Sequence, residues 1–323
     1  MRRRTLPVLS VGWLLGLLSV ANTQPVQEAK HVGLLSTGDN PLTLALRDGL
    51  RERGWIESSN IILHTRWTEG KQERAQAMAA ELVSMGVAVI VAPSAGSYEE
   101  ARRATSTIPI VFCTHGDPIG TGHVASLARP GGNMTGLSLL QDVVNEKKIE
   151  ILFEAVPTIR RLGVLLNPSV ATAATNTKAV EHALQRLNRT AVLVDVRTED
   201  DLDGAFEKLR KEKADALFVI GSAFMYLHRY ELSRLALQHQ LPSMFPFIEN
   251  AQAGGLMTYA PDLPDNYRRC AGYVDKILRG ANPADLPIEQ PTVFKLVINT
   301  RTAAALGVMI PPTLLARADE VIE

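Results

Sequence analysis

The chain of 323 residues contains few cysteines and no excess of either charge. Its two cysteines, Cys113 and Cys270, cannot build a disulfide framework, so we expect each to be a small buried apolar residue. Their spacing leaves open whether they are bridged. Lysine plus arginine number 34, and aspartate plus glutamate also number 34. The resulting net charge of zero argues against a general nucleic-acid-binding protein, which needs a strong positive field.

Signals for a metal or a cofactor are also scarce. The seven histidines show neither the H-E-x-x-H pattern nor another paired spacing of a metal site. The segment Gly120–Ala125 matches the G-x-G-x-x-A pattern of dinucleotide-binding loops, but it begins well past the strand expected at Ile108–Cys113. We therefore predict no metal and no cofactor.

Long apolar runs are missing after the first twenty residues or so. Arginines at 2–4 precede a nearly continuous apolar stretch at 6–20, which ends in small residues at 19–21. This order is typical of a secretory signal, and about 15 apolar residues are too few to span a membrane. We predict a signal peptide at 1–23 and a periplasmic location. No cysteine follows the run, so no lipid anchor of the usual bacterial kind is expected.

Short apolar runs alternate with amphipathic stretches in two series, at about 31–136 and 160–250. Strands that alternate with helices of ten or more residues indicate parallel sheets covered on both faces. The sequence therefore predicts an α/β protein with two Rossmann-like, doubly wound parallel-sheet lobes. The expected strands are His31–Ser36, Ile61–Arg66, Val87–Val91, Ile108–Cys113, Leu162–Leu166, Ala191–Val196, Ala216–Ile220 and Pro242–Phe245.

Glycine-rich segments suggest where the chain passes from one lobe to the other. We predict an N-terminal lobe of 30–136 plus 257–288 and a C-terminal lobe of 137–256 plus 289–323. Three such crossings are typical of a two-lobed clamp. Only a few residues in them have to absorb the rotation when the lobes close. The predicted hinge residues are Thr135, Gly136, Met257, Thr258 and Pro291.

Several stretches together resemble a known family. They are Arg47–Gly54, Ile108–Phe112, Gly116–Pro118, Ala128–Asn133, Ala253–Met257, Leu296–Asn299, Ile310–Pro312 and Leu314–Ile322. The chain resembles the ABC transporter substrate-binding proteins of the tryptophan/tyrosine-type group, within the type I periplasmic-binding-protein fold. The resemblance implies a small-molecule solute held between two lobes joined by three hinge segments. It also implies delivery to an ABC permease in the inner membrane, with no catalysis. A monomer is the plain expectation.

The solute is expected at the carboxyl ends of the parallel strands, where ligands bind in open α/β sheets. Helix N-termini and hydroxyls there suit a carboxylate, two acidic residues could hold an ammonium group, and two phenylalanines could flank an apolar body. An amino acid or a related carboxylate, aromatic or not, fits this set. The predicted binding residues are Ser36, Thr37, Ser94, Ser97, Thr114, Asp117, Asn167, Ser169, Ser222, Phe224, Phe247 and Glu249, of which Asp117 and Glu249 are the acids.

Two alternatives remain open from the sequence. The first is a ligand-sensing clamp that signals to a membrane receptor, which would use the same closed form. The second is an exported α/β hydrolase, because Ala92–Gly96 resembles a nucleophile elbow with Ser94 at its centre. A hydrolase also needs an acid and a histidine in nearby loops, yet His182 falls in a helix expected at 173–187, and His228 and His239 fall in one expected at 226–239.

Overall fold

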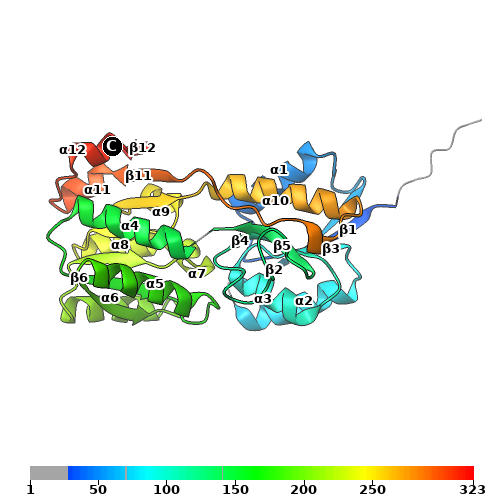
Figure 1. Ribbon diagram of the computed structural model, residues 1–323, viewed down its shortest axis with the longest axis horizontal. Helices are drawn as coiled ribbons and strands as arrows, with labels where there is room; N and C mark the ends of the chain where they lie inside the picture. The colour runs from blue at the N-terminus through cyan, green and yellow to red at the C-terminus, as the bar shows by residue number, and fades with distance from the viewer. Residues whose placement is uncertain (1–27, 70, 140) are drawn as a thin grey trace, which may run out of the picture.

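The computed structural model describes residues 28–69, 71–139 and 141–323. The predicted signal peptide lies outside these residues. Two α/β lobes lie side by side along the long axis of the molecule, as Figure 1 shows, with the C-terminus on the second lobe. Among the described residues, no helix is long and apolar enough to cross a membrane. The predicted fold class is confirmed.

The N-terminal lobe is built on a five-stranded sheet in the order β2-β1-β3-β4-β5, with every neighbouring pair parallel. Its elements are β1 (Lys30–Ser36), α1 (Pro41–Glu52), β2 (Ile61–Trp67), α2 (Gln72–Ser84), β3 (Val89–Val91), α3 (Ala95–Ala104), β4 (Ile110–His115), β5 (Met134–Ser138), α10 (Leu263–Leu278) and the short 3-10 helix η1 (Pro283–Asp285).

Helices cover both faces of this sheet. In β1, Val32 and Leu34 pack toward α1 and α10, whereas Leu35 packs toward α2 and α3. Successive strand side chains point to opposite faces, so a sheet buried on both sides requires the continuous apolar runs that the sequence shows. Asn40 caps the N-terminus of helix α1, and its side chain accepts from the backbone N–H groups of Leu42 and Thr43.

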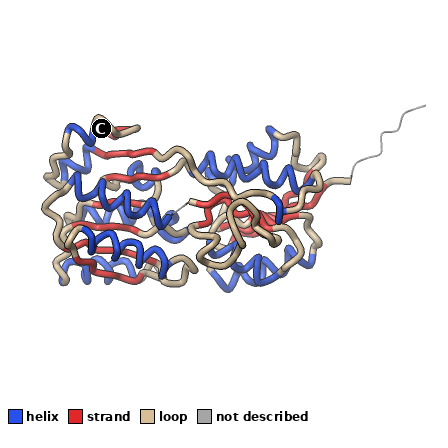
Figure 2. Tube along the Cα trace, viewed as in Figure 1, coloured by secondary structure: helices blue, strands red, loops and turns tan. Residues whose placement is uncertain are grey.

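The C-terminal lobe contains a seven-stranded sheet in the order β12-β11-β10-β9-β8-β6-β7, in which only the β10–β11 pair is antiparallel. Figure 2 shows its helices on both sides of the sheet. Its elements are α4 (Gln141–Ala155), β6 (Arg161–Leu166), α5 (Ala173–Arg186), β7 (Thr190–Asp195), α6 (Asp201–Lys211), β8 (Ala216–Val219), α7 (Ala223–Leu227), α8 (Arg229–Gln238), β9 (Ser243–Phe245), α9 (Ile248–Gln252), β10 (Met257–Ala260), β11 (Lys295–Asn299), α11 (Thr300–Ala305), α12 (Pro312–Leu315) and β12 (Glu320–Ile322).

The chain crosses between the sheets three times, at places that differ slightly from the predicted ones. Thr135 and Gly136 lie inside β5 of the first sheet, so the first crossing follows Ser138. Met257 and Thr258 lie inside β10 of the second sheet, so the second crossing follows Ala260. The lobe boundaries at 136/137 and 256/257 are corrected accordingly, because strand pairing decides to which lobe a residue belongs.

The third crossing runs from the N-terminal lobe to β11. Glu289 pairs with the end of β5, where its N–H donates to the carbonyl of Gly136 and its carbonyl accepts from the N–H of Ser138. The chain is therefore attached to the first sheet as far as Glu289, and β11 begins at Lys295. Pro291 lies in the segment between them, and its role as a hinge stays a prediction.

Candidate functional site

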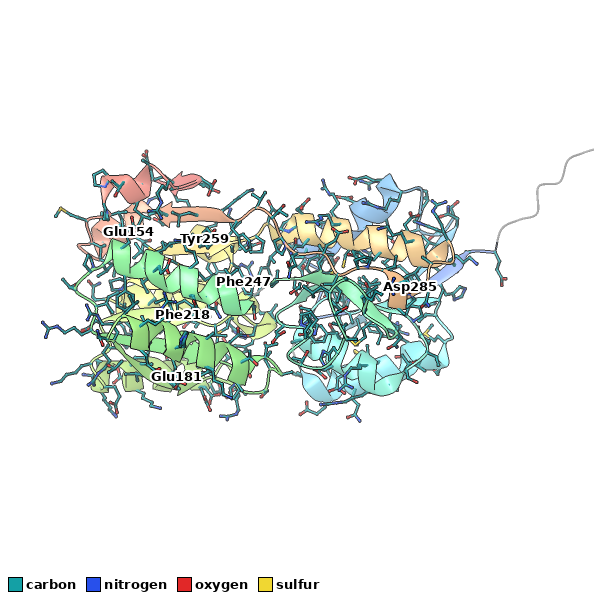
Figure 3. All side chains as sticks on the ribbon, in the orientation of Figure 1. Glu154, Glu181, Phe218, Phe247, Tyr259 and Asp285 are labelled. Carbon is teal, nitrogen blue, oxygen red and sulfur yellow. The ribbon has the colours of Figure 1, made fainter. Side chains whose placement is uncertain are left out.

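A cavity lies between the two lobes at the carboxyl ends of both sheets, with about 650 Å³ of space that protein atoms do not fill. Figure 3 shows Phe247 where the lobes meet. The N-terminal lobe contributes Thr37, Asn40, Leu42, Ser94, Ala95, Tyr98, Thr114, Gly116, Leu139, Leu263 and Tyr267, and the C-terminal lobe contributes Gln141, Val170, Thr172, Gly221, Ser222, Ala223, Tyr226 and Phe247.

Four aromatic rings form much of the apolar lining. Tyr226 and Phe247 meet edge to face, with ring centroids 5.6 Å apart. Tyr98 and Tyr267 face them from the N-terminal lobe, and both are buried. Rings from both lobes suit a flat apolar body, because stacked and edge-on contacts stabilise aromatic groups.

The ring of Tyr98 is held by a buried histidine. It stacks on His115 with centroids 4.3 Å apart and an angle of 11° between the planes. Burial and the nearby His123 lower the pKa of His115 to about 3, so this imidazole is neutral at physiological pH. Burial also raises the pKa of Tyr98, so its hydroxyl stays protonated.

The hydrogen bonds of the histidines define their tautomers. The N–H of Asp117 donates to Nδ1 of His115 at 3.2 Å, which leaves the ring proton on Nε2. That nitrogen lies 2.8 Å from Nδ1 of His123, and Nε2 of His123 lies 3.0 Å from the carboxylate of Glu99. These hydrogen bonds all run in one direction, from the backbone N–H of Asp117 to the carboxylate of Glu99. They therefore fix the orientation of the His115 ring that stacks on Tyr98.

A side-chain amide lies where the two lobes approach each other. Gln141 is so close to Gly116 and Gly221 that a Cβ atom at either glycine would lie within 3 Å of the amide. Its Oε1 accepts from Asn176, which in turn accepts from Asn145. The glycines therefore allow a polar group from α4 to reach the cavity, and the asparagines orient it.

Five of the twelve predicted binding residues line the cavity. They are Thr37, Ser94, Thr114, Ser222 and Phe247. Four more, Ser97, Asn167, Ser169 and Phe224, line an outer hollow that shares a wall with the cavity. This outer hollow also includes Lys71, Glu99 and Arg103.

The three remaining predicted residues line neither of these spaces, and their role in binding stays a prediction. Ser36 is buried at the end of β1 and is not among the residues that line either space. Asp117 accepts from the N–H of Gly120 at 2.7 Å, so its carboxylate closes a turn. Glu249 lines a separate hollow beside Arg229 on the other side of Tyr226. Burial raises the pKa of the Glu249 carboxyl.

The hydroxyl of Ser94 is part of a helix cap. Ser94 and Ser97 form a capping box at the start of α3, and their hydroxyls lie 3.3 Å apart. The hydroxyl of Thr114 donates to the carbonyl of Pro93, and that of Ser222 accepts from the N–H of Met225. The Ser-His-Asp triad of a nucleophile elbow uses a histidine as its base, whereas the partner of the Ser94 hydroxyl is Ser97.

Sequence reasoning missed several lining residues. Tyr267 comes from α10, which no strand-end argument would place at the cavity. Tyr226 was expected inside one long helix at 226–239, but the helix breaks at His228 into α7 and α8, and Tyr226 lines the cavity from α7. The only available signal for Gln141 was its place just after the first crossing.

Both cysteines are buried and free, as expected for small apolar residues. The thiol of Cys270 donates to the carbonyl of Phe112 at 3.3 Å, and burial raises its pKa. Among the described residues, no group of three or more His, Cys, Asp or Glu side chains is arranged to hold a metal ion.

The fold and the cavity define a class: a two-lobed protein that encloses a small molecule between α/β lobes. The chain belongs to the family of ABC transporter substrate binding proteins, whose family model matches residues 42–322. This confirms the resemblance noted in the sequence. The fold is that of the type I periplasmic binding proteins.

Three known proteins illustrate the similarity. A conserved domain protein of Vibrio cholerae shares 26% identity and superposes with a TM-score of 0.85 over 91% of this chain and 100% of its own. An ABC domain from Streptococcus pneumonia in complex with L-Trp shares 24% identity, with a TM-score of 0.84 over the same shares. A tyrosine-binding protein of Clostridioides difficile (strain R20291) is 23% identical over 284 residues, 87% of this chain and 81% of that protein.

Proposed function

We propose that this chain is exported to the periplasm by residues 1–23 and captures one small solute with an aromatic body for an ABC permease in the inner membrane. One observation carries the proposal: a cavity at the ligand-binding edge of two sheets, with aromatic rings from both. The relatives that bind tryptophan and tyrosine support an aromatic solute. The protein acts as a monomer and performs no catalysis.

The binding cycle follows from the fact that both lobes line the cavity. A solute that first contacts one lobe gains further contacts when the other lobe closes on it. The solute shifts the equilibrium toward the closed form only by its differential affinity for that form. The permease then recognises the closed arrangement of the lobes.

A thermal-shift screen of aromatic acids, amides and amino acids tests the proposal. A solute at about 100 times its Kd stabilises the folded state by about 2.7 kcal/mol, because only that state binds it. The variant Gly221→Val should lose this response, since its side chain would meet Gln141 and Phe247 in the cavity. Gly204→Val is the control, because a Cβ atom there meets nothing within 4 Å.

Two results would contradict the proposal. If no compound raises the melting temperature and the protein turns over an ester, the chain is an enzyme. If compounds stabilise Gly221→Val and the wild type equally, the solute binds outside the cavity.

A further inference from the structure

The cavity between the lobes is lined almost wholly by neutral groups. Among the described residues around it, tyrosine is the only titratable type. Burial raises the pKa of Tyr226 to about 12, so its hydroxyl is neutral at physiological pH like that of Tyr98. The polar groups that remain are hydroxyls, amides and backbone N–H groups, none of which carries a charge.

The carboxylates nearest to the cavity have other roles. Asp117 closes its turn, and Glu249 lies in the separate hollow with Arg229, Asp262 and Lys295. In the outer hollow, Glu99 pairs with His123 at 3.0 Å and with Arg102 at 3.5 Å. The acids that the sequence suggested for an ammonium group therefore do not line the cavity.

A buried ammonium group needs a partner of opposite charge, because an unpaired charge loses its hydration without compensation. Helices α1, α3 and α5 add to this cost, since their N-cap residues Asn40, Ser94 and Thr172 line the cavity. The N-terminal end of a helix carries partial positive charge. The cavity therefore disfavours a solute with a cationic end and favours a solute with aromatic rings and hydrogen-bond acceptors.

We propose that the solute is an aromatic molecule without an ammonium group, such as an arylalkanoate or its amide, rather than an α-amino acid. This rests on the proposed function of the cavity and narrows its substrate class. The four rings contact the flat body, and the hydroxyls and the amide of Gln141 bond its polar end.

Matched pairs of compounds test this class. Isothermal titration of the purified chain should give a Kd at least tenfold lower for 3-phenylpropionate or 3-phenylpropanamide than for phenylalanine, and likewise for indole-3-propionate than for tryptophan. Equal or tighter binding of the amino acids would overturn the inference and leave the proposed function standing. No binding of any compound in these pairs or in the wider screen would overturn both.

Variants that add a carboxylate to the cavity provide a second test. Gln141→Glu keeps the acceptor that bonds Asn176 and adds a carboxylate to the cavity, so phenylalanine should bind at least tenfold more tightly to it than to the wild type. Thr172→Asp adds a carboxylate at a helix N-cap, where aspartate is favourable, and should act alike if the first variant does not fold. Gln252→Glu, outside the cavity, is the matched control. Unchanged phenylalanine binding in both folded cavity variants would contradict the inference.

Discussion

Lys148 in α4 is a buried cation, and its replacement should stabilise the protein in a pH-dependent way. Its side chain is buried, and among the described residues Nζ reaches only the carbonyl of Pro246, at 3.5 Å. Burial lowers the pKa of Lys148 from 10.5 to about 7. At roughly 1.4 kcal/mol for each pH unit between these values, the protonated side chain costs the folded state about 5 kcal/mol.

The sign of the pH dependence follows from proton binding. Between pH 7 and 10.5 the unfolded chain binds more protons at Lys148 than the folded chain does, so this contribution to the free energy of unfolding rises with pH. Lys148→Met keeps an unbranched apolar stem and removes the charge. It should raise the free energy of unfolding by about 3–5 kcal/mol at pH 6 and by less than about 1 kcal/mol at pH 10.

Urea unfolding followed by circular dichroism at pH 6, 8 and 10 measures this difference. Lys147→Met is the matched control, because Lys147 is exposed and pairs with Glu150 at the surface. Its effect should stay within about 0.5 kcal/mol at every pH. A Lys148→Met variant that is less stable than the wild type at pH 6, or whose advantage does not shrink with pH, would refute the reasoning.

Three further predictions concern packing. Gly49→Ala should lower the melting temperature by several degrees, because its Cβ would meet the backbone of α10 at 2.5 Å. Gly272→Ala, on α10 itself, should raise the melting temperature slightly, because its Cβ has room. Gly136→Ala should cost about 3 kcal/mol or more in chemical unfolding, because its φ of 144° and the backbone of β4 both exclude a side chain. Cys113 and Cys270 should react with Ellman's reagent only after unfolding, giving two thiols per chain; one thiol reacting in the native protein would contradict this.

Much of the fold could be predicted because buried parallel strands have an unusual sequence pattern. Runs such as Leu162–Leu166 and Ala216–Ile220 are apolar on both faces, and helices with polar faces separate them. The break at His228 could not be predicted, because neither proline nor glycine marks it. The first two crossings were misplaced by two and four residues, since strand pairing rather than glycine content decides where a sheet ends.

The site was only partly predictable for a related reason. The rule that solutes bind at the carboxyl ends of strands pointed to Ser94, Thr114 and Phe247, and these three residues do line the cavity. It could not show which way a side chain in such a loop points, and the carboxylates of Asp117 and Glu249 do not line this cavity. It also could not find Tyr267, which reaches the cavity only because α10 packs back on the first lobe.

The central claim is that one solute binds between the two sheets. A crystal structure of the protein with the tightest compound from the screen tests it most directly. The account predicts density for one molecule among Tyr98, Gln141, Tyr226, Phe247 and Tyr267. Density for the compound in the hollow beside Glu249, or elsewhere on the surface with this cavity empty, would contradict it.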